Sequence, residues 1–143
     1  MNAATKADTN NIDPEILKAL LASREAAYAP YSGFQVSAVA VSSDGSTFAG
    51  CNVETAHFKS ICAEASAISA MIGSGRRELA AIYILGPGET ACPPCGDCRQ
   101  RIHEFAQPDT RVILIDESGR KLHNHAIEEL LPSAFGPGSL KPT

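Results

Sequence analysis

The chain has 143 residues, 44% of them apolar, and a formal net charge of -4 from 12 Lys+Arg against 16 Asp+Glu. This length suits one domain that buries roughly two-thirds of the surface of its unfolded chain, and the composition excludes wholesale disorder. The acidic balance argues against nucleic acid as a partner. With no basic run longer than Arg76-Arg77, a polybasic membrane anchor is not expected either.

Targeting and redox signals point to the cytoplasm. The longest strictly apolar run, Leu79–Leu85, is far shorter than the ~20 residues that cross a bilayer. The first eleven residues are polar and lack the apolar centre of a signal peptide. The five cysteines are an odd number, and a reducing compartment disfavours disulfides. Metal binding or catalysis is therefore the better expectation for these thiols.

The first third of the chain predicts a tail, a helix and a hairpin. Residues 1–12 read as a flexible N-terminal tail. Asp13 followed by Pro14 is typical of a helix start, because Asp caps the helix and Pro suits its first turn. Strands are predicted over Phe34–Val41 and Thr47–Val53, with an Asp-Gly pair between them as a strong hairpin signal.

The rest of the chain predicts helices that alternate with buried strands. The helices are predicted over residues 61–72, 95–105 and 125–131, and the strands over 79–85 and 112–115. This order predicts an α/β fold, a mixed β-sheet covered by helices on both faces. Residues 13–135 would form this single domain, followed by a Gly/Pro-rich tail over residues 136–143.

Four of the five cysteines lie near the starts of two predicted helices. Cys62 begins one helix, and Cys92, Cys95 and Cys98 lie at the start of the other. The N-termini of helices that follow strands of one sheet can converge on one edge, and their partial positive charge lowers the pKa of a thiol. Three thiolates there would make a zinc site with its fourth position open.

A zinc ion with an open position is catalytic, because a water bound there ionises near neutral pH. Glu64, two residues after Cys62, is close enough to take a proton from that water and pass it to a substrate nitrogen. A His or Cys two residues before Glu, followed later by Pro-Cys-x-x-Cys, is a known signature of zinc-dependent deaminases. Here it reads Cys62-Ala63-Glu64 and Pro94-Cys95-Gly96-Asp97-Cys98.

Further motifs extend this match. They are Tyr31-Ser32-x-Phe34-x-Val36, Gly50-Cys51-Asn52-Val53-Glu54, Pro94-Cys95-Gly96-x-Cys98-Arg99-Gln100 and Leu130-Leu131-Pro132-x-x-Phe135. With these motifs in this order, about residues 14–135 resemble the small cytidine deaminases. Several spaced motifs that agree are far more specific than one Cys-x-x-Cys pair.

The resemblance implies a reaction and a set of roles. Water activated on zinc attacks C4 of a cytosine ring, while the glutamate protonates N3 and helps ammonia leave. Carried onto this chain, the resemblance assigns zinc binding to Cys62, Cys95 and Cys98, proton transfer to Glu64, ribose 3'-hydroxyl binding to Asn52 and Glu54, base contacts to Phe34 and the backbone N–H of Ala63, and pocket closure to Phe135. It also implies a nucleoside substrate and a homo-oligomer, commonly a tetramer in which Phe135 reaches a neighbouring subunit's pocket.

The chain departs from the family's usual pattern near the metal and in the sugar loop. Ala65 stands where an Arg normally offsets part of the thiolate charge, and the loss of that Arg should make the thiolates more electron-rich unless helix dipoles or another cation such as Arg99 or His57 compensates. Thr55 and Phe58 replace the usual Asn and Tyr, and the loop looks one residue shorter than usual. The leading substrates are cytidine and 2'-deoxycytidine. The alternative is a nucleoside antibiotic of the blasticidin S type, whose deaminases also lack that Arg and have a remodelled loop.

Simpler explanations compete with each assignment. The cysteines would also suit a closed structural zinc site, a Cys92/Cys95 redox pair or an iron–sulfur run, although Ile102 occupies the next cysteine position of such a run. Cys51 is more typical of a small core residue. The remaining candidates have structural readings too: Glu64 as a first-turn acid, Asn52 and Glu54 as turn formers, and Phe34 and Phe135 as core residues.

Overall fold

The computed structural model describes residues 10–140. Its elements are α1 (Pro14–Ala26), β1 (Ser37–Ser42), β2 (Thr47–Cys51), α2 (Ala63–Gly73), β3 (Leu79–Leu85), α3 (Gly96–Phe105), β4 (Ala106–Ile115), β5 (Lys121–Ala126), α4 (Ile127–Leu130) and the 3-10 helix η1 (Pro137–Leu140). The strands form one sheet in the order β2-β1-β3-β4-β5. Only β3 and β4 pair in parallel, so the sheet is mixed, as predicted.

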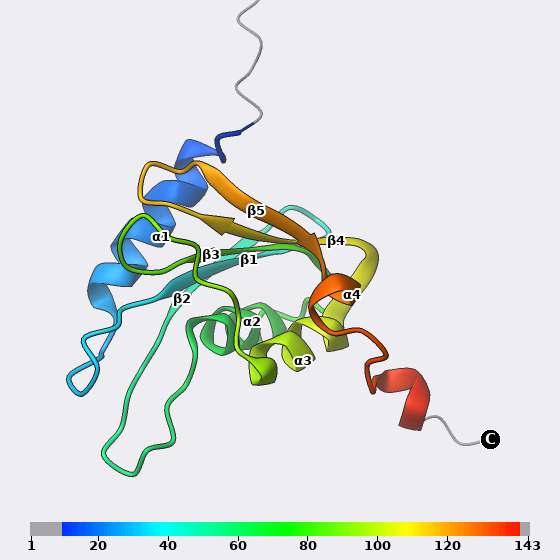
Figure 1. Cartoon of the computed structure of the whole chain (residues 1–143). Helices are drawn as coiled ribbons and strands as arrows, with labels where there is room; N and C mark the ends of the chain where they lie inside the picture. The colour runs from blue at the N-terminus through cyan, green and yellow to red at the C-terminus, as the bar shows by residue number, and fades with distance from the viewer. Residues whose placement is uncertain (1–9, 141–143) are drawn as a thin grey trace, which may run out of the picture.

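Helices cover both faces of this sheet, which confirms the predicted fold class (Figure 1). On one face α1 packs over side chains of the central strands, including Val39, Leu85 and Ile113. On the opposite face α2 and α3 lie over a second apolar cluster that includes Ile82 and Val112. Among residues 10–140, no helix combines the length and apolar character needed to cross a bilayer.

The local signals at the first helix and the hairpin act as predicted. The side chain of Asp13 accepts a hydrogen bond of 2.8 Å from the backbone N–H of Glu15, and Pro14 is the first residue of α1. Gly45 turns the β1–β2 hairpin with φ +85°, a conformation that glycine adopts without steric cost. Its N–H donates to the carbonyl oxygen of Ser42 at 2.9 Å.

Strand β5 was not predicted, and the last helix begins later than expected. The β5 segment reads Lys-Leu-His-Asn-His-Ala and lacks the apolar alternation of a half-buried strand. It exists because β4 offers a free edge, with which β5 pairs antiparallel from Lys121 to Ala126. Strand β4 is also longer than predicted, since it begins at Ala106 and not at Val112. The hydrogen bonds to the edge of β4 stabilise β5, and the sequence pattern of β5 does not indicate them.

The chain just before α1 belongs to the folded domain, which corrects the predicted tail. The N–H of Ile12 donates to the carbonyl of Gly119 at 2.9 Å, and the N–H of Lys121 donates to the carbonyl of Asn10 at 2.7 Å. Ile12 is buried in the apolar cluster beneath α1. Residues 1–9 lie outside the described residues, as do residues 141–143 of the predicted C-terminal tail.

Candidate active site

Two helix starts carry the cysteine cluster. Cys62 is the N-cap residue of α2, and Cys95 is the N-cap residue of α3. Cys98 follows as the third residue of α3. Because β2 and β3 both pair antiparallel with β1, they run in the same direction. The helices that follow them therefore begin at the same edge of the sheet, where open α/β folds place their sites.

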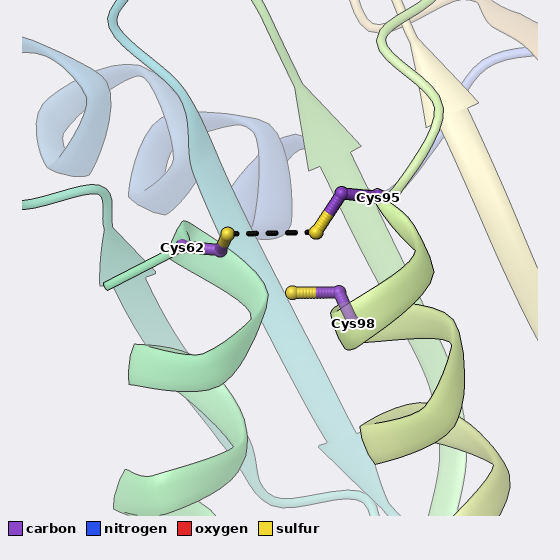
Figure 2. A group of neighbouring side chains, drawn as sticks. All are labelled: Cys62, Cys95 and Cys98. Atoms are coloured by element: carbon purple, nitrogen blue, oxygen red, sulfur yellow. Dashed lines mark hydrogen bonds between the residues drawn. The ribbon is translucent and has the colours of Figure 1, made fainter. Parts of the chain in front are cut away.

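The three sulfurs point toward one another (Figure 2). The Sγ atoms of Cys62, Cys95 and Cys98 all lie within 4.8 Å of one another, and those of Cys62 and Cys95 are 3.7 Å apart. Thiolates around a tetrahedral zinc ion, with Zn–S bonds of ~2.3 Å, are separated by ~3.8 Å. All five cysteines are free thiols. The number, type and spacing of the donors fit Zn²⁺.

The pKa values of two of the thiols differ from the prediction that the helix N-termini lower them. Burial raises the pKa of Cys62, and the neighbouring Cys95 raises it further. Burial also raises the pKa of Cys98, and the carboxylate of Glu64 adds to the effect. Without a metal ion, desolvation and neighbouring negative groups therefore disfavour the thiolate forms. Three negative sulfurs at this spacing require a cation between them, which agrees with a divalent metal site.

A pocket of about 210 Å³ opens in front of the cluster. The predicted site residues that line it are Phe34, Asn52, Cys62, Ala63, Glu64 and Cys95. Glu64 lies in the first turn of α2 and is only 4% exposed. Cys98 is fully buried and is not part of the pocket wall. A buried carboxylate therefore faces the same small cavity as two of the sulfurs.

Two glycines let the chain approach the cluster closely. A Cβ atom at Gly50 in β2 would lie 2.4 Å from the backbone nitrogen of Ala67, so α2 rests directly on the strand. Next to this contact, Ser66 Oγ donates to the carbonyl of Cys51 at 3.0 Å. A Cβ at Gly86 would lie 2.6 Å from Cys92 Cβ. Close packing of this kind fixes the first turn of α2.

Asn52 clamps the segment that carries Phe34. Its Oδ1 accepts from the backbone N–H of Val36 at 2.9 Å, and its Nδ2 donates to the carbonyl of Phe34 at 2.8 Å. An amide has a second N–H and a second lone pair, so Asn52 keeps hydrogen-bonding capacity for a ligand in the pocket that it lines.

Glu54 lies outside the pocket wall and binds a neighbouring turn. Its carboxylate accepts from the backbone N–H groups of Tyr31 at 3.0 Å and Ser32 at 3.1 Å, and from Ser32 Oγ at 2.5 Å. The hydrogen bond from Ser32 lowers the pKa of Glu54. The Tyr31-Ser32 pair belongs to one of the motifs that resemble the family, but no role was predicted for it. The available signal was that this motif occurs together with the Asn52-Val53-Glu54 segment, to which it binds.

The remaining predicted residues lie around the site. Phe34 is half exposed at the pocket, whereas Phe135 is 60% exposed and lies off the pocket wall. The carbonyl of Phe135 accepts from Gln100 Nε2 of α3 at 2.7 Å. Ile102, at the position where an iron–sulfur run would need a cysteine, is fully buried in the core.

The cation that contacts the cluster was not predicted. Arg99 donates to the carbonyl oxygens of Pro94 and Leu130, each at 2.9 Å, and His57 lies on an exposed loop. Arg101, one turn after Cys98, places Nη1 3.8 Å from Cys98 Sγ. The i, i+3 spacing of Cys98 and Arg101 on a predicted helix was the missed signal, because such residues share a helix face.

Comparison with known proteins agrees with this geometry. Residues 11–115 match the family described as "Cytidine and deoxycytidylate deaminase zinc-binding region". A cytidine deaminase of Halalkalibacterium halodurans is 39% identical over 121 residues, 84% of this chain and 91% of that protein. A cytidine deaminase of Sporosarcina psychrophila is 36% identical over 118 residues, 82% of this chain and 86% of that protein.

Solved structures of cytidine deaminases have a similar fold. The crystal structure of cytidine deaminase from Burkholderia pseudomallei has a TM-score of 0.77 and 40% identity, covering 85% of this chain and 97% of that chain. Cytidine deaminase from Mycobacterium leprae has a TM-score of 0.70 and 35% identity, covering 83% of this chain and 96% of that chain. The predicted resemblance is confirmed, and the chain belongs to the cytidine and deoxycytidylate deaminase family with its zinc-binding region.

Proposed function

We propose that this protein hydrolyses cytidine and 2'-deoxycytidine to uridine and 2'-deoxyuridine and releases ammonia. One observation carries the proposal: three cysteine sulfurs lie within 4.8 Å of one another beside the buried carboxylate of Glu64. The relatives that match most of the chain are named cytidine deaminase, which supports the same reaction.

Zinc is held in this proposal by Cys62, Cys95 and Cys98. When bound, it supplies a water that is reactive at neutral pH. Cys62 and Cys95 line the pocket, and Cys98 closes the buried side. A metal held by these three sulfurs would be reached from the cavity, where a substrate ring can enter.

Glu64 moves the protons. Its carboxylate would take one proton from the attacking water and deliver it to N3 of the ring, and then take the second proton from the new C4 hydroxyl and deliver it to the departing amino group. A C4–O bond forms and the C4–N bond breaks, which leaves a carbonyl at C4 and free ammonia. Because Glu64 is only 4% exposed and lines the pocket, a molecule reaches its carboxylate through the pocket.

The base is held by the start of α2 and by an aromatic ring. Ala63 is the first residue of α2, so its N–H has no partner within the helix and is free to donate to the base carbonyl. Phe34 lines the same pocket and packs near the ring. The pocket, at about 210 Å³, is smaller than the ~300–1,000 Å³ typical of drug-sized ligands and suits a small base.

The sugar is held by Asn52 and Glu54 at its 3'-hydroxyl. Asn52 lines the pocket, and Glu54 is two residues further along the chain. The carboxylate of Glu54 is ionised at neutral pH even at its ordinary pKa of 4.5, and the hydrogen bond from Ser32 lowers that pKa further, so Glu54 can accept a hydrogen bond from a hydroxyl. No cationic side chain of the described residues lines this pocket, which favours an uncharged nucleoside over its 5'-phosphate.

A homotetramer in the cytoplasm, with a role in pyrimidine salvage, completes the proposal. Phe58 is 89% exposed and Phe135 is 60% exposed, and large apolar side chains of this kind are typical of interfaces. Phe135 would close the pocket of a neighbouring copy. Sedimentation equilibrium tests this directly: a tetramer has four times the 15.0 kDa chain mass, and a monomer would contradict it.

A second candidate substrate is a cytosine nucleoside antibiotic of the blasticidin S type. Ala65 and the exposed Phe58 favour it, since both depart from the usual family pattern. The chemistry at C4 is unchanged, and only the sugar-side contacts differ.

The deciding experiment measures ammonia release from cytidine, 2'-deoxycytidine, deoxycytidylate and blasticidin S. We expect the highest kcat/KM on the two unmodified nucleosides and a much lower value on deoxycytidylate. A clear preference for blasticidin S would favour the second candidate. No release from any of the four by the zinc-loaded protein would contradict both.

A further inference from the structure

Arg101 contacts the cysteine cluster at Cys98, and neither residue lines the pocket. Its Nη1 lies 3.8 Å from Cys98 Sγ, close enough for an N–H···S hydrogen bond. Cys98 is fully buried and is not part of the pocket wall. The two residues are three apart on α3, so they lie on one face of the helix.

The cluster needs such a cation. Three thiolates around Zn²⁺ sum to a charge of about -1, and the carboxylate of Glu64 in the same pocket wall brings the sum to about -2. Buried negative charge is costly unless a partner offsets it. The residue after Glu64 is Ala65, which is buried and uncharged. The charge has to be offset from another direction.

The neighbouring cation Arg99 binds other partners. Both hydrogen bonds of the Arg99 guanidinium go to backbone carbonyls, at Pro94 and Leu130. Within residues 10–140, Arg101 is the cationic side chain with a hydrogen bond to a cluster sulfur. Its ion pair with Asp97 spans 4.0 Å between exposed side chains, an arrangement that contributes little. The contact with Cys98 is therefore the specific one.

We propose that Arg101 is a positioning residue for the metal site, which donates to Cys98 Sγ and offsets the negative charge of the three thiolates. This inference rests on the proposed function, because it requires the cysteines to hold the metal. The guanidinium of Arg101 is always charged and presents planar N–H donors. Its capacity to donate to Cys98 Sγ therefore does not depend on pH. The residue acts through Cys98 and does not touch the substrate.

Arg101→Gln, Arg101→Lys and a distant control, Arg77→Gln, test this role. Zinc affinity is measured by competition with a chelator, and folding by circular dichroism. We expect Arg101→Gln to bind zinc ~10–100-fold more weakly, as is typical when a partner of a metal ligand is removed. Arg101→Lys keeps the charge and should lie between Arg101→Gln and the wild type. Arg77, which follows the opposite end of α2 and donates to Ile72, should have no effect.

A spectroscopic readout separates this role from a merely structural one. In the cobalt-substituted protein, the sulfur-to-cobalt charge-transfer band should move to longer wavelength in Arg101→Gln, because a thiolate without its hydrogen bond holds its lone pairs less tightly. Wild-type affinity and an unmoved band in Arg101→Gln would overturn the inference. Should Arg101→Gln not fold, the same two results in Arg101→Met, which removes the charge and the N–H donors and keeps a long side chain, decide it.

The zinc content of the wild-type protein distinguishes failure of the proposed function from failure of the inference about Arg101. If the wild-type protein itself takes up no zinc, the metal site and this inference fall together. If the wild type binds one zinc per chain and Arg101→Gln binds it equally well, only the role of Arg101 falls.

Discussion

The cysteine cluster and the loop between Val53 and Ile61 border the same site but are built differently. The cluster lies at the first turns of two helices that pack on the sheet, and Cys98 is fully buried. The loop projects away from the sheet (Figure 1), and Phe58 at φ 58° is 89% exposed. Backbone hydrogen bonds of 2.9 Å between Val53 and Ile61 close its base.

This difference indicates that the cluster determines the reaction and that the loop influences which substrate binds. Metal binding and proton transfer need side chains placed to within ~0.5 Å, which packed helices supply. An exposed loop tolerates substitution because few contacts depend on it. Two of the departures from the usual family pattern, Thr55 and Phe58, lie in this loop. Changes in the cluster should therefore abolish turnover, and changes on the sugar side should alter binding.

The largest effect is expected at Glu64. Glu64→Gln keeps the size of the side chain and removes the proton carrier, so kcat should fall by ~10²–10⁴-fold or more. Zinc content and the unfolding temperature should match those of the wild type, because the substitution changes no sulfur ligand. Steady-state kinetics with metal analysis check this. A variant with wild-type kcat would show that Glu64 does not move the protons.

The next test compares two cysteines of one Cys-x-x-Cys pair. Cys95→Ser should lose or weaken zinc binding, since it removes one of three sulfurs within 4.8 Å of one another. Cys92→Ser is the matched control: Cys92 lines the same pocket but is not one of the three sulfurs that lie within 4.8 Å of one another. Metal analysis should give one zinc per chain for this control. Unchanged zinc in Cys95→Ser would move the ligand set onto Cys92.

A smaller effect tests the packing beneath the cluster. Gly50→Ala would place a methyl group 2.4 Å from the Ala67 nitrogen, so α2 must shift. We expect a loss of ~1–3 kcal/mol in the free energy of unfolding, typical of overpacking, and weaker zinc binding. Gly73→Ala, at the other end of α2, meets nothing within 4 Å and should stabilise by ~0.4–1 kcal/mol. Equal unfolding energies for the two variants would contradict tight packing at Gly50.

The smallest effect concerns pH and Glu54. Hydrogen bonding from Ser32 lowers the pKa of Glu54 below its ordinary value of 4.5. The carboxylate therefore contributes stability that is complete well above pH 4.5 and is lost as the pH falls through the lowered value. Glu54→Gln should be less stable than the wild type at pH 7, and the gap should close in acid. Urea unfolding at several pH values checks this, and a gap independent of pH would argue against it.

Much of the fold was predictable because its signals are local. The capped start of α1, the Asp-Gly hairpin and the apolar runs of β3 and β4 all follow from short-range chemistry. Strand β5 and the buried Ile12 were not predictable in this way. Both depend on hydrogen bonds to distant segments: β5 pairs with β4, and Ile12 binds Gly119. A polar sequence at a sheet edge carries no periodic signal of its own.

The site was predictable as far as its motifs reach. Their spacing indicated that Cys62, Cys95 and Cys98 would meet, because two helices that follow strands of one sheet begin at one edge. The directions in which the arginine side chains point could not be predicted from the sequence. Arg99 and His57 were named as cations that could offset the thiolate charge, yet Arg99 donates to carbonyl oxygens, while Arg101 reaches the sulfur. Phe135, expected to close a pocket, lies off the pocket wall of its own chain.

The central claim is that three sulfurs hold zinc and leave one position open. X-ray absorption at the zinc edge of the purified full-length protein tests it most directly. The account predicts one zinc per chain with three sulfur neighbours at ~2.3 Å and one lighter oxygen or nitrogen neighbour. Four sulfur neighbours would mean a closed structural site that includes Cys92 or Cys51, and would contradict the account.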